Sequence, residues 1–456
     1  MTIIFGLISL SVLVVVHEIG HFLAARMCGI TVENFSIGMG PVLLHKTVHG
    51  IDYRLSLIPF GGYCGLKGEK DFQAALDEKR DYFTKDPSSM YGSHPLKRLI
   101  IAAAGPFFNA LFAALAFTII ALAGYTYYSA DNRIILADEI YPDVTSYARA
   151  QGFRTGDRIL SLNGSPIQTF ADISRYISAR PDEDITAVVE RGGERIELEL
   201  RPAFEKSAGA GKIGVVNWID PVIAAVPERG EAELSGLRKG DTITAVNGTP
   251  VFSAAEVFKY LSADAGGNSE NARQVELTYR RGEDAHDERT ALIKISGGEQ
   301  LFSFEMPKHR SRAYSFFPAL AYGITETLDT AGLTIKSIGF LFRGADVTNA
   351  VSGPVRITVM LGDAVKTGFG AGTRQGLASV LSLLALISVS LFIMNLLPVP
   401  ILDGGIVFFS LVQIVLRKPL KPKFLYHIQF IGIAFIGALI VLALFGDARY
   451  LFFNRK

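Results

Sequence analysis

The sequence predicts a multi-pass α-helical membrane protein into which two smaller α+β modules are inserted. Hydrophobic residues make up 49% of its 456 residues, and they gather in four apolar runs at 3–25, 99–124, 377–397 and 428–445. Each run approaches the length of about 20 residues that crosses a bilayer as a helix. Residues 126–310 instead combine turns, charges and alternating strands. A net charge of only +1 argues against a nucleic-acid partner.

Basic residues in the connecting loops predict the orientation of the spans. The first loop carries ten Lys and Arg residues between positions 26 and 98, and the last loop reads RKPLKPK at 417–423. Loops rich in Lys and Arg stay in the cytoplasm. Both termini and the insert at 126–376 are therefore expected on the external side, although the C-terminal NRK opposes this orientation. Both cysteines, Cys28 and Cys64, then face the reducing side.

The insert contains an internal repeat. The stretch GFRTGDRILSLNGSPI at 152–167 returns as GLRKGDTITAVNGTPV at 236–251, with apolar and turn residues in matching positions. In each copy an Asn-Gly pair between alternating apolar residues predicts a tight turn. A predicted helix follows each copy, at 170–179 and 253–262, and a hairpin is expected at 188–200. The pattern resembles the PDZ domain in its bacterial arrangement, which captures chain ends by adding a strand to its edge.

Two roles stay open for these PDZ-like modules, peptide capture and a steric lid or spacer with an idle groove. A working groove is expected to use the loop before each repeat, near 140–144 and 224–228. The sequence then divides into a first membrane pair (1–125), PDZ-like modules (126–205 and 206–300), a connecting segment (301–376) and a second membrane pair (377–456).

The first apolar run ends in the motif HEIGH. On a helix, His17 and His21 share one face about 6 Å apart, so both can coordinate one ion, and Glu18 lies beside them. These three residues fit a catalytic Zn²⁺ site. Such a site uses three protein ligands and leaves a fourth position for water, and the Glu then accepts a proton from that water. Chance occurrence is the alternative. An unpaired ionisable side chain in the bilayer costs on the order of 2.5–3.5 kcal/mol, which argues against chance.

The better candidate for the third ligand is Asp403, in NLLPVPILDGG at 395–405. Pro398 and Pro400 must break the helix of the third apolar run, and the following glycines are expected to form an open turn. Broken helix at membrane depth is tolerated only where it is buried or lines a cavity. In isolation, an LDGG turn indicates a helix cap. The first and third spans run in the same direction, however, which places all three ligands near the cytoplasmic end. The other histidines are expected at the surface: His45, His49, His94, His286, His309 and His427.

Together, HEIGH in the membrane, NLLPVPILDGG, AAAGPFFNALFA at 102–113 and the tandem repeats resemble the site-2 protease family of intramembrane zinc proteases, and its bacterial members with tandem PDZ domains in particular. The resemblance covers essentially the whole chain. It implies that His17, His21 and Asp403 bind zinc and that Glu18 is the catalytic base.

The resemblance also implies residues that contact substrate. Asn395 and Pro398, in the NxxPxP part of the motif, would engage the substrate backbone near the scissile bond. Asn109, in the second apolar run, is placed in the same group, with helix packing as the alternative role.

The family also has a membrane-dipping hairpin after the first helix. Here FSIGMGPVLL and DYRLSLIPFGGY alternate suitably around His49-Gly50. Such a hairpin either holds an unwound substrate as an added strand or plugs the site. The predicted fold is then a membrane protein of about four transmembrane helices, with a membrane-associated β-hairpin and two PDZ-like α+β domains. Within 313–372, an amphipathic helix on the outer membrane surface is preferred over a fifth span, because charged residues interrupt it.

The implied activity is that of a zinc metalloendopeptidase of the bacterial inner membrane, with the PDZ-like modules outside and the active site near the cytoplasmic side. Its substrates would be single-pass transmembrane proteins, such as anti-sigma factors or remnant signal peptides, already trimmed by an upstream site-1-type protease. The alternative is a non-catalytic membrane scaffold with structural zinc, which would not require Glu18. A metal transporter is less favoured, because only one ligand cluster is visible.

Overall fold

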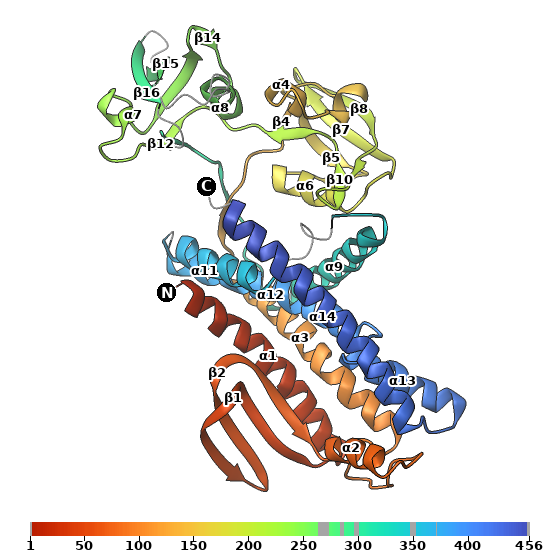
Figure 1. Ribbon diagram of the computed structural model, residues 1–456. Coiled ribbons are helices and arrows are strands. Elements are labelled where there is room, and N and C mark those ends of the chain that lie inside the picture. The colour runs from red at the N-terminus through yellow and green to blue at the C-terminus, as the bar shows by residue number, and fades with distance from the viewer. Residues whose placement is uncertain are drawn as a thin grey trace. The chain divides into compact units, whose positions relative to one another are not determined.

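The computed structural model describes residues 2–262, 273–282, 287–295, 301–346, 353–370 and 372–453. The chain divides into a helical unit and a β-rich unit (Figure 1). The helical unit comprises Met1–Tyr125, Ser311–Phe342 and Asp346–Arg455, and the β-rich unit consists mainly of Thr126–Arg310.

Four of the described helices are long and apolar enough to cross a membrane, which confirms the four predicted runs. They are α1 (Thr2–Met27), α3 (Pro95–Ala123), α12 (Thr373–Leu396) and α14 (Pro422–Phe453). Helix α3 begins at Pro95, whose fixed φ suits a first turn, and the His94 side chain accepts a hydrogen bond from Leu96 N at 3.2 Å. Helix α12 ends where Leu397, which precedes Pro398, becomes extended, as predicted.

Helix α3 is the central helix of this unit. It packs against α1, α12, α9 (Phe316–Phe342) and α13 (Asp403–Leu416). Small residues allow the backbones to approach closely, as is usual for membrane helices. A Cβ atom on Gly20 of α1 would overlap the carbonyl of Ala104, and one on Gly323 of α9 would overlap the side chain of Thr118.

Within its described residues, the segment expected to hold one surface helix contains two helices, α9 and α11 (Pro354–Gly370). Helix α9 is not among the four candidate spans, and its place on the outer membrane surface stays a prediction. Helix α11 packs against α1, α12 and α14. The buried carboxylate of Asp447 in α14 accepts hydrogen bonds from the N–H groups of Gly353 and Val355 at 3.1 and 3.0 Å. An acid just beyond the last apolar run is thus used to cap the start of α11.

The loop after α1 forms the predicted hairpin. Strands β1 (Val32–Val48) and β2 (Ile51–Leu66) pair antiparallel, and His49 and Gly50 make the turn with φ of 49° and 80°. Two positive φ values in a two-residue turn match the twist of the strands. Phe35 pairs with both Cys64 and Tyr53, so the long strands fold back on themselves into a wider sheet. Strand β2 lies along α1 (Figure 1). Helix α2 (Glu69–Asp77) follows the hairpin.

The β-rich unit contains two four-stranded sheets with the same strand order, β6-β5-β7-β8 and β14-β13-β15-β16. The strands of the first are β5 (Arg158–Leu162), β6 (Ser165–Pro166), β7 (Ile185–Arg191) and β8 (Glu194–Leu200), and those of the second are β13 (Asp241–Val246), β14 (Thr249–Pro250), β15 (Arg273–Arg281) and β16 (Glu288–Ile295). The predicted Asn-Gly turns are confirmed, because Asn163 and Asn247 have φ of 45° and 50°. The predicted helices are α6 (Phe170–Ser178) and α8 (Ala254–Ser262). Assignment of these sheets to the PDZ fold stays a prediction.

Each sheet contains a buried ion pair. Its acid lies where the turn of the repeat leads into β5 in the first sheet and into β13 in the second. Asp157 is 1% exposed and accepts two hydrogen bonds from Arg191, each of 2.7 Å. Asp241 is equally buried and accepts bonds of 2.8 and 2.7 Å from Arg281. These carboxylates hold the turn to the neighbouring strand, β7 or β15. The sequence indicated only that they are turn residues. The bidentate contact raises the pKa of Arg191 above its ordinary value.

Short elements complete the β-rich unit. They are β3 (Thr126–Tyr128), β4 (Ile134–Leu136), α4 (Ala137–Ile140), α5 (Tyr147–Ala150), β9 (Ala203–Glu205), β10 (Ala210–Lys212), β11 (Val215–Asn217), β12 (Ile223–Ala225), α7 (Glu231–Leu234), β17 (Ser303–Phe304) and β18 (Lys308–Arg310). Strands β3 and β18 pair where the chain enters and leaves the unit.

Candidate metal centre and active site

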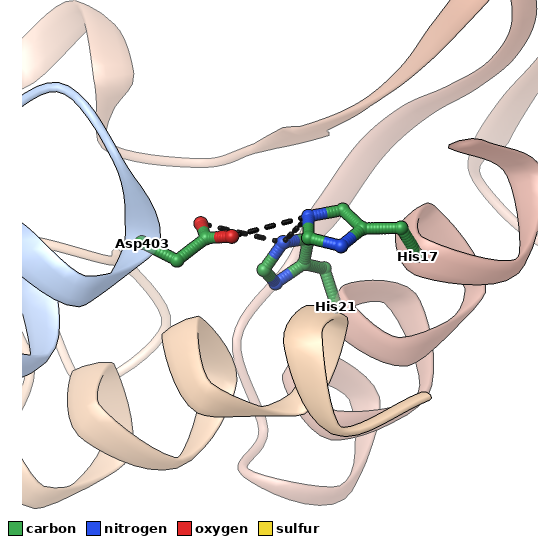
Figure 2. Close-up of side chains that lie close together, drawn as sticks. All are labelled: His17, His21 and Asp403. Atoms are coloured by element: carbon green, nitrogen blue, oxygen red, sulfur yellow. Dashed lines mark hydrogen bonds and ion pairs between the residues drawn. The ribbon is translucent and has the colours of Figure 1, made fainter. Parts of the chain in front are cut away.

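Three predicted ligands, distant in the sequence, converge in the helical unit (Figure 2). His17 and His21 lie one turn apart on α1, and Asp403 is the first residue of α13. His17 Nε2 is 3.1 Å from Asp403 Oδ2, and His21 Nε2 is 3.4 Å from Asp403 Oδ1. The two Nε2 atoms are 3.1 Å apart. Within the described ranges, this is the group of His, Cys, Asp and Glu side chains close enough to share a metal ion.

The distances among these donor atoms fit a zinc ion. Ligand atoms about 2.1 Å from a tetrahedral Zn²⁺ lie roughly 3.4 Å from one another. His21 Nδ1 is 2.8 Å from the carbonyl oxygen of Ile101, which can only accept, so the neutral ring carries its proton on Nδ1. Its Nε2 lone pair then faces the Asp403 carboxylate. Facing lone pairs repel each other unless a cation lies between them, so the donor set fits zinc.

Helix α3 forms the wall behind the two histidines. A Cβ atom on Gly105 would overlap His21 Nε2 and would lie 2.8 Å from His17 Nε2. Glycine is therefore required here for its size, since any side chain would occupy the space of the ligand rings. The sequence indicated close helix packing at this position but not contact with the metal ligands.

Asn109 lies one turn further along α3 and is fully buried. Its Nδ2 is 3.2 Å from His17 Nδ1, whereas its Oδ1 is buried without a hydrogen-bond partner. The structure thus places Asn109 against His17, a predicted metal ligand, on the side away from Asp403. Its predicted contact with substrate stays a prediction.

Asp403 reaches the histidines because α13 begins at that residue. The sequence interpretation of Gly404 and Gly405 as an open turn is wrong, since both lie in the first turn of α13. Their small size matters instead. A Cβ on Gly404 would overlap the backbone of Leu396, and one on Gly405 would overlap the carbonyl of Val399. The glycines let α13 pack directly on the broken end of α12, which points Asp403 toward α1.

Glu18 lies beside the three ligands and is held by the hairpin. Its carboxylate is near enough to His17, His21 and Asp403 to interact electrostatically with all three. The backbone of Cys64 in β2 donates a hydrogen bond to it. This contact from β2 could not be predicted from the spacing of HEIGH.

Other predicted residues lie outside this cluster. Asn395 is in the last turn of α12, and Pro398 is in the non-helical segment that connects α12 to α13. His45, His49, His94 and His427 are exposed, as predicted. His309 is partly exposed, at 23%, and its Nε2 lies 3.1 Å from the carbonyl oxygen of Ser129. His286 lies outside the described residues.

Comparison with known proteins identifies the family. Peptidase family M50 matches residues 5–439. A protein of Treponema pallidum named "Putative zinc metalloprotease" is 38% identical over 99% of both chains. Proteins with the same name from Borreliella burgdorferi and Vibrio cholerae are 27% and 29% identical, over 98% and 97% of each chain. M50 peptidases are zinc-dependent. The chain therefore belongs to peptidase family M50, the site-2 protease family of zinc metalloproteases.

Proposed function

We propose that this protein is an intramembrane zinc endopeptidase that hydrolyses a peptide bond in the transmembrane segment of another protein. The observation that carries the proposal is the position of Glu18. This carboxylate stands beside a three-ligand cluster, on a helix apolar enough to cross a membrane. A structural zinc site is closed by four ligands and has no use for an adjacent base.

The residues of the cluster fit amide hydrolysis. His17, His21 and Asp403 would hold the zinc ion, which would supply a Lewis acid to polarise the scissile carbonyl and activate water. Glu18 accepts a proton from the attacking water as the new C–O bond forms. The same carboxyl group then donates that proton to the amide nitrogen as the C–N bond breaks. The hydrogen bond from Cys64 keeps Glu18 oriented during both transfers.

A substrate helix must unwind before its carbonyl can reach this site, because helical hydrogen bonds shield each peptide group. The non-helical segment around Pro398 and the neighbouring Asn395 support a role in holding unwound backbone. Strand β2 lies along α1 and reaches Glu18, which positions the hairpin for both of its predicted roles, strand addition and plugging of the site.

The cellular setting follows from the resemblance and the loop charges. We place the protein in the bacterial inner membrane, with the insert outside and the metal centre toward the cytoplasm. Its substrates are single-pass proteins such as anti-sigma factors or remnant signal peptides, trimmed beforehand by a site-1-type protease. The PDZ-like modules either exclude untrimmed substrates or recruit trimmed ones.

Reconstituted protein and a single-pass model substrate test the activity. Glu18→Gln is expected to retain zinc and lose cleavage by at least about 10²-fold, because it removes the base and no ligand. Glu194→Gln, at the exposed start of β8 in the β-rich unit, is the matched control and should cleave normally. Wild-type turnover by the Glu18 variant would refute the catalytic assignment. Absence of cleavage by the unaltered protein would favour the scaffold.

A further inference from the structure

A second site lies apart from the metal centre, where α3 begins and α13 ends. A cavity of about 820 Å³ opens there. It is lined by residues 82–85 and 91–94 of the first loop, by Pro95 and Arg98 of α3, by Gln413 and Ile414 of α13, and by residues 417–419. None of the zinc-site residues lines it. The proposed proteolysis gives this cavity no role.

The lining of this cavity is strongly basic. It carries four cationic side chains, Lys85, Arg98, Arg417 and Lys418, and no carboxylate. Two acids of the same loops are already engaged elsewhere. Asp81 lies 2.7 Å from Lys421 and Asp86 lies 2.9 Å from Lys67. Neither acid lines the cavity, so its positive charge is not balanced within the lining.

Arg98 gives the cavity its buried charge. This residue is only 5% exposed, and its Nη2 donates a 2.9 Å hydrogen bond to Gln413 Oε1. Its Nε is buried and has no hydrogen-bond partner. In the part of the chain that the structure describes, the ion pairs include no carboxylate for Arg98. A buried guanidinium without a counter-ion is expensive, and a bound anion would offset that expense.

The surroundings favour an anion that carries apolar chains. Exposed apolar side chains continue from the cavity along both helices, with Leu96 and Ile100 on α3 exposed by 49% and 45% and Val415 on α13 by 78%. Tyr82, 61% exposed, lines the cavity, and tyrosine is enriched where helices leave the bilayer. Basic pockets between membrane helices bind anionic lipid headgroups. We propose that this cavity binds the phosphate headgroup of an anionic phospholipid, with Arg98 as its buried phosphate ligand.

Titration of the full-length protein in a neutral detergent tests the site. Native mass spectrometry would measure binding of phosphatidylglycerol, with phosphatidylcholine as the zwitterionic comparison and inorganic phosphate as a competitor. Phosphatidylglycerol should bind more tightly than phosphatidylcholine. Lys418→Gln and Arg98→Gln should each weaken binding by about fivefold. Lys421→Gln removes an equal charge from the same loop outside the cavity lining, and binding should change by less than about twofold.

Each other result would overturn part of the proposal. Equal losses of phosphatidylglycerol binding in the Lys418 and Lys421 variants would show that the basic loop attracts the lipid by its overall charge and not through the cavity. Binding of inorganic phosphate as tight as that of the lipid would assign the site to free phosphate instead. Because Lys418 is exposed, its variant remains informative even if Arg98→Gln disturbs the packing against Gln413. Unchanged lipid binding in the Lys418 variant would refute the site.

Discussion

Asn109 of α3 and His17 of α1 face each other, with Asn109 Nδ2 3.2 Å from His17 Nδ1. For His17 to bind zinc through Nε2, its Nδ1 must carry the proton and needs an acceptor. The two ends of a side-chain amide exchange places by a half turn. In that orientation Oδ1 of Asn109 becomes the acceptor for the His17 Nδ1 proton, which fixes the ring. Such partners of metal-binding histidines tune metal affinity.

Asn109→Leu should therefore weaken zinc binding by about 10- to 100-fold, because it keeps the volume and removes the acceptor. Asn109→Asp keeps an acceptor and should retain most of the affinity. Competition with a zinc chelator measures both. If Asn109 serves only helix packing, the leucine variant should bind zinc normally. A raised KM with unchanged zinc affinity would instead support the predicted contact with substrate.

Gly105→Ala should lose zinc, because the added methyl group would overlap the His21 ring. Gly332→Ala, in α9, is the control, since a Cβ there meets no atom within 4 Å. Both changes remove the helix penalty of glycine, about 1 kcal/mol. We expect higher thermal stability for the Gly332 variant and reduced zinc content for the Gly105 variant. Full zinc occupancy in the latter would show that α3 can shift away from the ligands.

Asp403→Asn should lose zinc as well as activity, because a neutral amide is a poor replacement for a carboxylate in a three-ligand site. Asp363→Asn makes the same change at an exposed position of α11 and should leave zinc content unchanged. Metal analysis of both purified variants checks this. An Asp403 variant with a full complement of zinc would place the third ligand elsewhere.

Asp157→Ala should destabilise the first sheet by about 3 kcal/mol, since it leaves Arg191 without its bidentate partner. This value is at the low end for buried pairs because the Arg191 side chain is 24% exposed. Hydrogen exchange of the β7 amides in the full-length protein measures the change. Asp184→Ala, whose side chain is 73% exposed, is the control and should alter exchange little. Equal protection of the β7 amides from hydrogen exchange in both variants would mean that the buried ion pair contributes no net stability.

Deletion of residues 126–310 tests how the insert selects substrates. Tyr125 and Ser311 are already joined by hydrogen bonds, of 2.8 Å from Tyr125 N to Ser311 Oγ and of 2.9 Å from Ser311 N to Tyr125 O. A short linker between them should preserve the helical unit. If the insert excludes untrimmed substrates, the deletion variant should cleave a full-length client. If the insert recruits substrates, the deletion should slow cleavage of even a trimmed client. Unchanged selectivity toward both clients would exclude both roles.

Local patterns were sufficient for the elements that carry the site. Helical spacing predicted that His17 and His21 share a face, and the apolar runs predicted the helices that cross a membrane. His49-Gly50 predicted the hairpin turn, because few residue pairs accept two positive φ values. In each case the controlling interaction is between a residue and its near neighbours, or between a segment and its solvent. Such information is present in a short stretch of sequence.

Contacts between distant segments were decided only by packing. The proximity of Asp403 to the histidines depends on how closely Gly404 and Gly405 let α13 approach the end of α12. The contact of Asn109 with His17 and the space left by Gly105 depend on the rotation of α3 against α1. Arg98 reads from the sequence as one more loop cation, yet it is buried beside Gln413, far along the chain. Hydropathy and spacing specify which segments are helices. Which side chains come into contact is decided by the complementary surfaces of whole helices. No single stretch of sequence contains that information.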